Sequence, residues 1–363
     1  MAELCLSQEP SQAEIKWSGL CVRGTFEQAQ KNFPVGVQFA ADGDRSVKLS
    51  RAILGQLREN AMPGGKRLVD RLAPDDFSPK ASSGRALVMC CALSYELTDS
   101  IRIGKVNKIF AEIGFDLMVV NFSDLAVVMS LPMRVQVIDA GEPSPEKFAS
   151  LLQGLYEDDL VKRTVEAANY PWSGDLAFAT AGITSVNVWD QAALEMPEAI
   201  RTNAEEHVSR IAAADFFDGA SLPVIPQTKG REMVFSLMRE ELADASRLAA
   251  NQVRQGVSFV LREPDYQIEL VIPAFQTVTL QKTDLAQTVQ NCSYARITLK
   301  EGGGKILYSE KHAANVTNLF PLSSKKTSTW LSYQDAMSKL FYEGIKQIRN
   351  NSKSQRLFKD CAP

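Results

Sequence analysis

The spacing of apolar and polar residues predicts alternating strands and helices in the first half of the chain. Apolar residues that alternate with polar ones or form short runs are typical of strands, whereas apolar residues three and four apart are typical of a helix face. A serine followed by a proline, as at Ser144 and Pro145, marks the start of a helix. The predicted elements are a strand at 35–40, a helix at 46–62, a strand from 86, a hairpin over 112–139 that turns at 121–124, and a helix from 144.

The second half repeats this order of elements. It predicts a strand at 222–225, a helix over 230–250, strands at 256–261 and 266–275, a hairpin over 294–313 that turns at 302–304, and a helix opened by Ser332. Corresponding landmarks lie about 180 to 190 residues apart, which suggests that one unit has been duplicated. Two unrelated lobes that share an order by chance are the alternative.

These patterns predict an α/β (α+β) fold of two similar lobes, each a small mixed sheet with a β-hairpin and packed helices. A chain of 363 residues is long enough for two such lobes. The expected organisation is an N-terminal segment at 1–34, a first α/β lobe at 35–170, a helical connector at 171–220, and a second α/β lobe at 221–363 that ends in a basic helix and tail.

Composition is that of a globular protein and gives no sign of nucleic-acid binding. Hydrophobic residues make up 45% of the chain, charged residues 23%, and the formal net charge is -3. The sequence has no apolar run of the roughly 18 residues that a membrane-spanning helix needs. We therefore expect no nucleic-acid partner and no transmembrane segment, while peripheral contact with a membrane stays open.

Two adjacent cysteines, Cys90 and Cys91, lie in the most apolar run of the chain and raise the question of a reactive centre. Neighbouring residues on a strand point to opposite faces, so the two thiols do not converge on one ligand. A reactive thiol also needs a basic neighbour and some exposure, and this run supplies neither. We predict that both cysteines are reduced and buried.

Near the N-terminus, residues 15–24 carry the pattern Trp-x-Gly-x-Cys-x-x-Gly, formed by Trp17, Gly19, Cys21 and Gly24. This segment resembles the opening of a MORN-like hairpin found near the mature N-terminus of some exported bacterial proteins. The resemblance implies a disulfide between Cys5 and Cys21 and a periplasmic or extracytoplasmic location. A cytoplasmic protein with incidental terminal thiols is the alternative.

Other candidate chemistry is sparse. The two histidines, His207 and His312, lie about a hundred residues apart and do not form the clustered His and Cys pattern of a zinc site. No nucleophile-elbow pattern supports a Ser–His or Cys–His pair. We expect no metal, no cofactor and no identifiable catalytic residue, and the pairing of Cys292 and Cys361 is left open.

The C-terminal end carries an excess of positive charge. The candidate contact residues there are Lys353, Arg356 and Lys359, which would face an acidic protein or an anionic lipid surface. Cations that merely solvate the end of a helix and its tail are the alternative.

These expectations favour a non-enzymatic binding or assembly protein of the bacterial cell envelope. It would act through protein–protein contacts, with a protein partner or by self-association into an oligomer, because unpaired strand edges can accept another strand. The alternative is a hydrolase-type enzyme with a site assembled between the two lobes. A deep interlobe cleft with converging polar groups would favour the enzyme, and an exposed strand edge would favour the binding protein.

Overall fold

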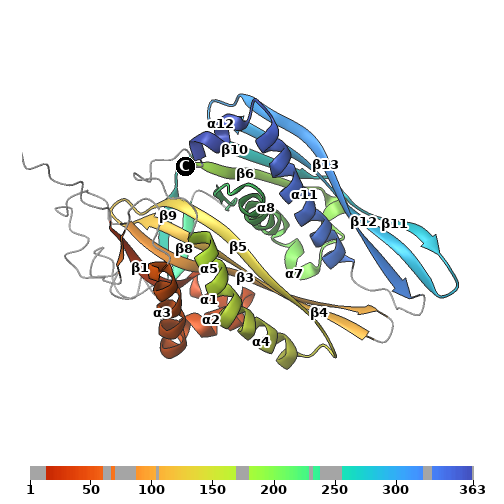
Figure 1. The fold of residues 1–363 in the computed structure, drawn as a ribbon, viewed down its shortest axis with the longest axis horizontal. Coiled ribbons are helices and arrows are strands. Elements are labelled where there is room, and N and C mark those ends of the chain that lie inside the picture. Colours follow the sequence, from red (N-terminus) through yellow and green to blue (C-terminus); the bar gives the residue numbers. More distant parts are fainter. Residues whose placement is uncertain are drawn as a thin grey trace, which may run out of the picture.

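The computed structural model describes residues 14–59, 67–69, 87–103, 106–168, 180–228, 232–237, 256–321 and 329–361. It confirms the predicted α+β fold in two lobes, each built on one sheet with helices packed against it (Figure 1). The first lobe is the first sheet with helices α1 to α5. The second lobe is the second sheet with helices α6 to α8, α11 and α12.

The first sheet curls into a small barrel. Its strands follow the order β2-β1-β3-β4-β5-β9-β8, and β8 pairs back with β1, which closes the ring. The barrel interior is apolar and includes Cys21, Cys90, Phe235 and Phe259, all fully buried. The strands are β1 (Glu14–Arg23), β2 (Arg67–Val69), β3 (Leu87–Ile103), β4 (Val106–Asn121), β5 (Ala126–Ala140), β8 (Glu232–Ser236) and β9 (Val257–Leu261).

Helices cover the outer face of this sheet, where Met89, Cys91 and Phe115 belong to the apolar core of the first lobe. They are α1 (Phe26–Asn32), α2 (Pro34–Ala41), α3 (Gly43–Glu59), α4 (Pro145–Gly154) and α5 (Leu160–Ala168), with a π-helical turn at Leu155–Asp159 between the last two. The predicted start of α4 is confirmed, because the Lys147 backbone N–H donates to Ser144 Oγ at 3.2 Å.

The second sheet carries its helices on one face. Strands β6 (Ala181–Val188), β7 (Val224–Ile225), β10 (Tyr266–Ile272), β11 (Phe275–Lys282), β12 (Ala286–Glu301) and β13 (Ile306–Pro321) form it. Its helices are α6 (Asp190–Ala193), α7 (Glu198–Arg201), α8 (Ala204–Ala220), α11 (Trp330–Asn350) and α12 (Gln355–Cys361). Helix α8 packs on α11 and β6 and also on β5 of the first sheet, so it lies between the two sheets (Figure 1).

The two sheets follow the same strand path. In the first, β1 is parallel to β3, and β3, β4 and β5 continue as an antiparallel meander. In the second, β6 is parallel to β10, and β10, β12 and β13 continue in the same antiparallel way. In both lobes helices separate the first two strands of the path, and a long helical segment follows the last one.

Two predicted elements are wrong. The alternating run expected to be a strand at 35–40 is helix α2, which Pro34 starts and which packs Phe39 against Tyr156 with ring centroids 5.2 Å apart. The helix expected over 230–250 begins instead as strand β8 at 232–236, and residues 238–250 lie outside the described ranges. The run 35–40 and the strand 232–236 each span only five or six residues, and periodicity alone does not separate helix from strand over so short a stretch.

The sheets divide the chain differently from the expected domain boundaries. Strands β8 and β9, from the second half, complete the barrel of the first lobe. Strand β6 and helix α8, from the segment expected to be a connector at 171–220, belong to the second lobe. The last long helix also starts earlier than expected, with Thr329 at its N-cap position, while Ser332 is buried in its first turn and accepts a hydrogen bond from Asn318.

Within the described part of the N-terminal segment, residues 14–23 form a single strand, β1. Trp17, Gly19 and Cys21 lie in β1, which is parallel to β3, and Gly24 leads directly into α1. Cys21 is a free, fully buried thiol, which speaks against the disulfide that the resemblance implied; Cys5 lies outside the described residues.

Candidate functional site

Charged residues within the apolar strands of the first sheet face the second lobe. In β4, Glu112 and Asp116 alternate with Ile113 and Phe115, whose side chains belong to the core under the first-lobe helices. Arg134 of β5 pairs across the sheet with Gly114, so it shares the face of the two carboxylates. This face lies against α8 and α11, and its charged groups are buried between the lobes.

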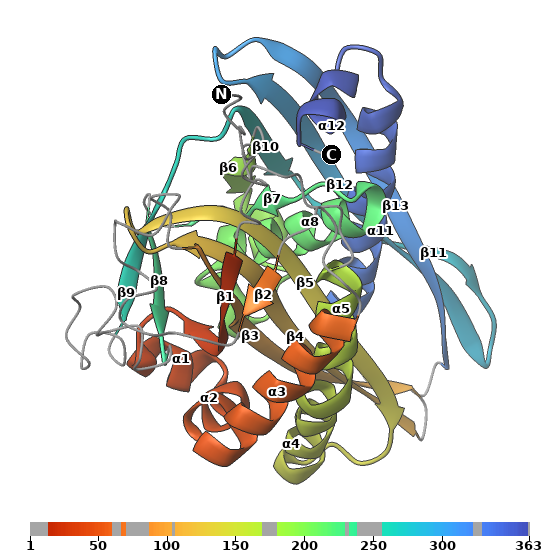
Figure 2. The same cartoon turned by 60° about the vertical axis from the view of Figure 1, so that its left-hand side comes forward.

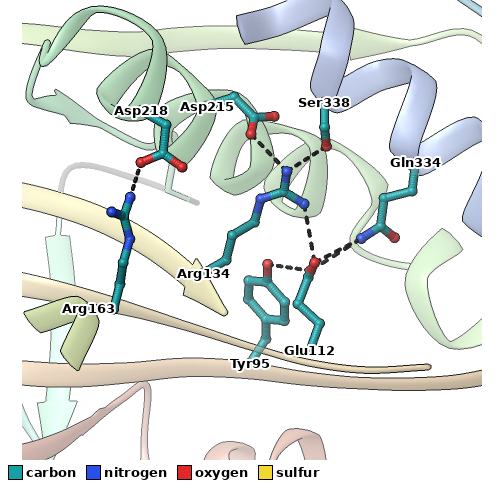
Figure 3. A network of polar contacts seen from close by, with 8 residues as sticks. All are labelled: Tyr95, Glu112, Arg134, Arg163, Asp215, Asp218, Gln334 and Ser338. Carbon is teal, nitrogen blue, oxygen red and sulfur yellow. Dashed lines mark hydrogen bonds and ion pairs between the residues drawn. The ribbon is translucent and has the colours of Figure 1, made fainter. Parts of the chain in front are cut away.

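Arg134 is the centre of this buried network (Figure 3). Its guanidinium donates to Glu112 of β4 at 3.1 Å, to Asp215 of α8 at 2.8 Å and to Ser338 of α11 at 2.7 Å. One side chain of the first lobe therefore contacts both central helices of the second. A second ion pair, between Arg163 of α5 and Asp218 of α8, joins the lobes beside it (Figure 3).

Glu112 accepts two more hydrogen bonds. Tyr95 Oη donates to Glu112 at 2.8 Å, and Gln334 Nε2 of α11 donates to it at 3.2 Å. The Tyr95 ring reaches this position because it lies flat over Gly114, where a Cβ atom would stand 2.0 Å from the ring. The glycine is required by this close approach, and the tyrosine in turn holds the carboxylate in place.

Burial sets the protonation of the network. Burial raises the pKa of Asp215 to about 6, against the lowering effect of Arg134, and burial also raises the pKa of Glu112. For Arg134, burial lowers the pKa, but Asp215 and Glu112 outweigh it, so the guanidinium stays charged. One cation between two carboxylates is a stable arrangement only while all three keep their hydrogen bonds.

A second charged cluster lies further along the same face. Arg23 at the end of β1 is 3.8 Å from Asp116 and 4.0 Å from Glu206 of α8. Arg210 of α8 pairs with Glu206 at 2.6 Å and donates to the Ser94 carbonyl at 2.7 Å. Burial, with Arg210 nearby, lowers the pKa of Arg23 to about 10, so this residue is still a cation at neutral pH.

His207 of α8 lies between these clusters. Its ring is 5.6 Å from that of Tyr95 and 6.2 Å from that of Trp330, and its buried Nε2 has no hydrogen-bond partner. Burial, aided by Arg210 and Arg134, lowers its pKa to about 3. The imidazole is therefore neutral at pH 7, and its surroundings are aromatic and cationic.

The charged groups between the lobes form ion pairs with one another. Arg134, Glu112 and Asp215 pair with one another and hold the two lobes together. Sequence reasoning missed all three. The available signal was the run 110–120, in which Glu112 and Asp116 interrupt an otherwise apolar strand, since charged residues in a buried strand require partners.

A pocket of about 280 Å³ lies where the two lobes meet, between residues of β6, β9 and β10. It is lined by β6, the segment after β7, and the loop between β9 and β10. Its charged residues are Arg262, which pairs with Asp124 at 2.7 Å, and Glu263.

The far end of the second sheet projects from the body as an arm, which comprises β11, residues 286–293 of β12 and residues 313–321 of β13 (Figures 1 and 2). Every residue of β11 after Phe275 is exposed. Of the strand residues of the arm only Lys282 is charged, although 23% of the chain is. The exposed apolar side chains at the arm are Val278, Leu280, Leu285 and Leu319.

The arm is fixed to the body at its base. Phe275 stacks on Tyr333 of α11 with ring centroids 5.1 Å apart, and Thr277 Oγ is 2.6 Å from the Tyr333 hydroxyl. Further out, Val289 and Phe320 pack against Ile101 and Phe110 of the first sheet, together with Leu331 of α11. The arm is thus presented in one orientation.

The structure places the predicted residues as follows. Cys90 and Cys91 are buried thiols outside any disulfide, as predicted, and Cys292 and Cys361 are also buried and form no disulfide among the described residues. Lys353, Arg356 and Lys359 are exposed, and the last two lie on helix α12 and not in a tail.

Arg356 contacts Asp360 at 3.3 Å, which offsets part of the positive charge at this end. In the described ranges no three His, Cys, Asp or Glu side chains gather as a metal site would need. None of the helices described there has the length and apolar composition to cross a bilayer.

No family model and no curated protein matches the chain. Among solved structures it is similar to a hypothetical protein of Chlamydia trachomatis, at 14% identity and a TM-score of 0.25, over 48% of this chain and 98% of that one. It is also similar to a neuraminyllactose-binding hemagglutinin homolog of Helicobacter pylori, at 10% identity and a TM-score of 0.25, over 50% and 86%. A minor lipoprotein of Acinetobacter baumannii matches at 11% identity and a TM-score of 0.17, over 27% and 73%. Likeness at this level establishes neither a family nor a function.

Proposed function

We propose that this protein is a non-enzymatic binding or assembly protein that acts through protein–protein contacts made by the arm. The observation that carries the proposal is the edge strand β11, which is exposed from Gln276 to Lys282 and lies at the end of the strand order of its sheet. An exposed edge offers unpaired backbone N–H and C=O groups that a strand of another chain can use.

The buried polar groups around Arg134 also support this proposal. The converging polar groups at Arg134 are paired with one another and buried between the lobes. These residues account for the fixed position of the lobes, which in turn fixes the direction of the arm.

Site-specific cross-linking tests the proposal. A photoreactive residue at Val278 on the arm is compared with one at Lys48 on the exposed face of α3, in cells that naturally make the protein. We expect covalent adducts with a protein, identified by mass spectrometry, from position 278 and not from position 48. The absence of adducts at 278, or the same adducts at both positions, would contradict the proposal.

We also propose that the protein works in the bacterial envelope, in a periplasmic or other extracytoplasmic place. The support is the resemblance of residues 15–24, and the free Cys21 weakens the part of it that concerns the disulfide. Fractionation of the native cells with an antibody against the protein tests this location, and recovery with cytoplasmic markers would contradict it.

We propose further that the lobes arose by internal duplication. The shared strand path supports this, because β1-β3-β4-β5 and β6-β10-β12-β13 run in the same order with the same directions.

Lys353, Arg356 and Lys359 are proposed as a second contact surface, for an acidic protein or a membrane surface. Replacing all three by Gln should weaken a salt-sensitive association and leave the melting temperature unchanged.

A further inference from the structure

We infer that the partner of β11 is β11 of a second copy of this chain, and that the two strands pair antiparallel across a two-fold axis. This inference rests on the proposed function, because it names the partner of the same edge. Its evidence is the geometry of the edge and the absence of charge along it.

The edge of β11 is open from the point where β6 ends. β6 and β10 run side by side until the Trp189 backbone N–H donates to the Ile272 carbonyl at 3.1 Å, and β11 begins three residues further on. Among the described residues β11 pairs with β12 and with no other strand. Trp189 is 52% exposed at this junction, and tryptophan is enriched at the centres of protein interfaces.

The pairing of β11 with β12 is regular from Phe275 to Thr279, which match Ser293 to Val289. A bulge then shifts the register at Leu280. Bulges interrupt strand pairing, so the bulge limits the usable edge to about five residues. This length matches a symmetric strand pair better than the addition of one long foreign strand.

The other long edge of the sheet is protected. β13 exposes Glu310 and Lys311 and ends at Pro321, and charged residues and proline are the usual protection of edges against pairing. From Phe275 to Gln281, β11 has neither charge nor proline. β11 carries its one charge, Lys282, at its far end beyond the bulge, whereas β13 carries Glu310 and Lys311 within the strand and Pro321 at its end.

The missing charge favours a second copy over a foreign strand. A two-fold axis brings like residues together, so a charged edge would repel itself, whereas Thr and Gln residues opposite one another are compatible and contribute favourable cross-strand pairs. A charged partner strand would find no ion-pair partner on β11 between Phe275 and Gln281, because its one charge, Lys282, lies beyond the bulge. The pattern of Gln, Thr and Val at 276–279 therefore fits self-pairing.

A charge-exchange experiment tests this inference. In an antiparallel two-fold pair, residues of one face meet residues of the same face, so Gln276 and Val278 meet the same positions of the copy. One variant carries Gln276→Lys with Val278→Lys, and the other carries Gln276→Glu with Val278→Glu. The oligomeric state is measured by sedimentation velocity over a range of protein concentrations.

We expect the unsubstituted protein to form a dimer, each variant alone to dimerise about tenfold or more weakly, and an equimolar mixture to form the heterodimer. A matched control carries Thr317→Lys with Leu319→Lys on the same face of β13, and it should dimerise like the unsubstituted protein. A monomer at all concentrations, an unaffected dimer in the variants, or a dimer lost in the control would each overturn the inference.

Hydrogen exchange of the unsubstituted protein keeps the test independent of how the variants fold. Amides at 275–279 should exchange more slowly at high than at low protein concentration, and equal rates would overturn the inference. The cross-linking at Val278 separates the two proposals. Adducts of twice the chain mass support self-pairing, whereas adducts only with another protein support the proposed function and overturn this inference.

Discussion

His207 and Asp215 lie two turns apart on α8, and their surroundings shift their pKa values in opposite senses. Burial raises the pKa of Asp215 from 3.8 to about 6, so its proton is bound more tightly in the folded state. Burial lowers the pKa of His207 from 6.5 to about 3, so its proton is bound less tightly there. By linkage, the Asp215 contribution to stability is lost as pH rises from about 4 to 6, whereas the His207 contribution is lost as pH falls from about 6.5 to 3.

These opposing effects are separable by substitution. Asp215→Asn should make the free energy of unfolding fall more steeply on acidification from pH 6 to 4, because only the His207 effect remains. His207→Leu should make it fall less steeply or rise, and each change is on the order of a few kcal/mol. Urea unfolding at several pH values measures this, with the exposed Glu205→Gln of the same helix as control. Identical pH slopes in all three variants would contradict the shifts.

Gly114 is the position where one methyl group has the largest predicted effect. In Gly114→Ala the new Cβ would meet the Tyr95 ring, whose hydroxyl holds Glu112, and the strain should cost roughly 1–3 kcal/mol. Gly55→Ala is the matched control, because nothing lies within 4 Å of a Cβ there and the position is an exposed helix interior. That change should stabilise the protein by about 0.5–1 kcal/mol. Equal effects on denaturant unfolding would refute the steric account.

At the scale of elements, long alternating strands on both sides of a turn were predictable, whereas helix α2 and strand β8 were not. The hairpin turns at 121–124 and 302–304 were correct because long alternating strands flank a polar or glycine-rich turn on both sides. The predictions for α2 and β8 were wrong because tertiary contacts determine the conformation of these residues. For α2 the contact is the packing of Phe39 on Tyr156, and for β8 it is the pairing with β1 that closes the barrel. Local preference is weak in such runs and packing overrides it.

Helix α11 buries the face that its spacing predicts. Phe341 is fully buried, with its ring centroid 5.8 Å from that of Phe216 on α8. Phe341→Ala should lower the free energy of unfolding by roughly 3–5 kcal/mol, because it removes an aromatic ring between two central helices. Gln347→Ala, on the exposed side of the same helix, should change it by less than about 0.5 kcal/mol. Thermal unfolding of both variants measures the difference. A larger loss of stability in Gln347→Ala than in Phe341→Ala would contradict this assignment of the buried face.

At the scale of the whole molecule, the interlobe network lies beyond what one sequence can show. Charged residues in the apolar run of β4 indicate that buried partners exist, but the sequence does not show which residues these are. Arg134 contacts Asp215 of α8 and Ser338 of α11, which lie 81 and 204 residues away along the chain. The same holds for the arm, whose uncharged composition is visible in the sequence while its projection from the body is not. Long-range pairing brings these residues together, and spacing does not encode it.

Strands β8 and β9, from the second half of the chain, complete the barrel of the first lobe. Phe259 of β9 fills the barrel against Phe122 and Phe235, with ring centroids 5.2 and 5.7 Å away. Phe259→Ala should cost roughly 3–5 kcal/mol and should speed amide exchange in β3 and β4, although the substituted residue belongs to the second half of the chain.

Native-state hydrogen exchange of Phe259→Ala distinguishes the two ways of dividing the molecule. If the lobes followed the linear division at 171–220, faster exchange would appear in β10 and β12 and leave β3 and β4 unchanged. Val260→Ala on the exposed side of the same strand is the control, since its side chain is 47% exposed and fills no space in the barrel. Because β9 pairs with β5 and β8 pairs with β1, a cavity at Phe259 weakens the closure on both sides, and the loss of protection should reach β1 as well.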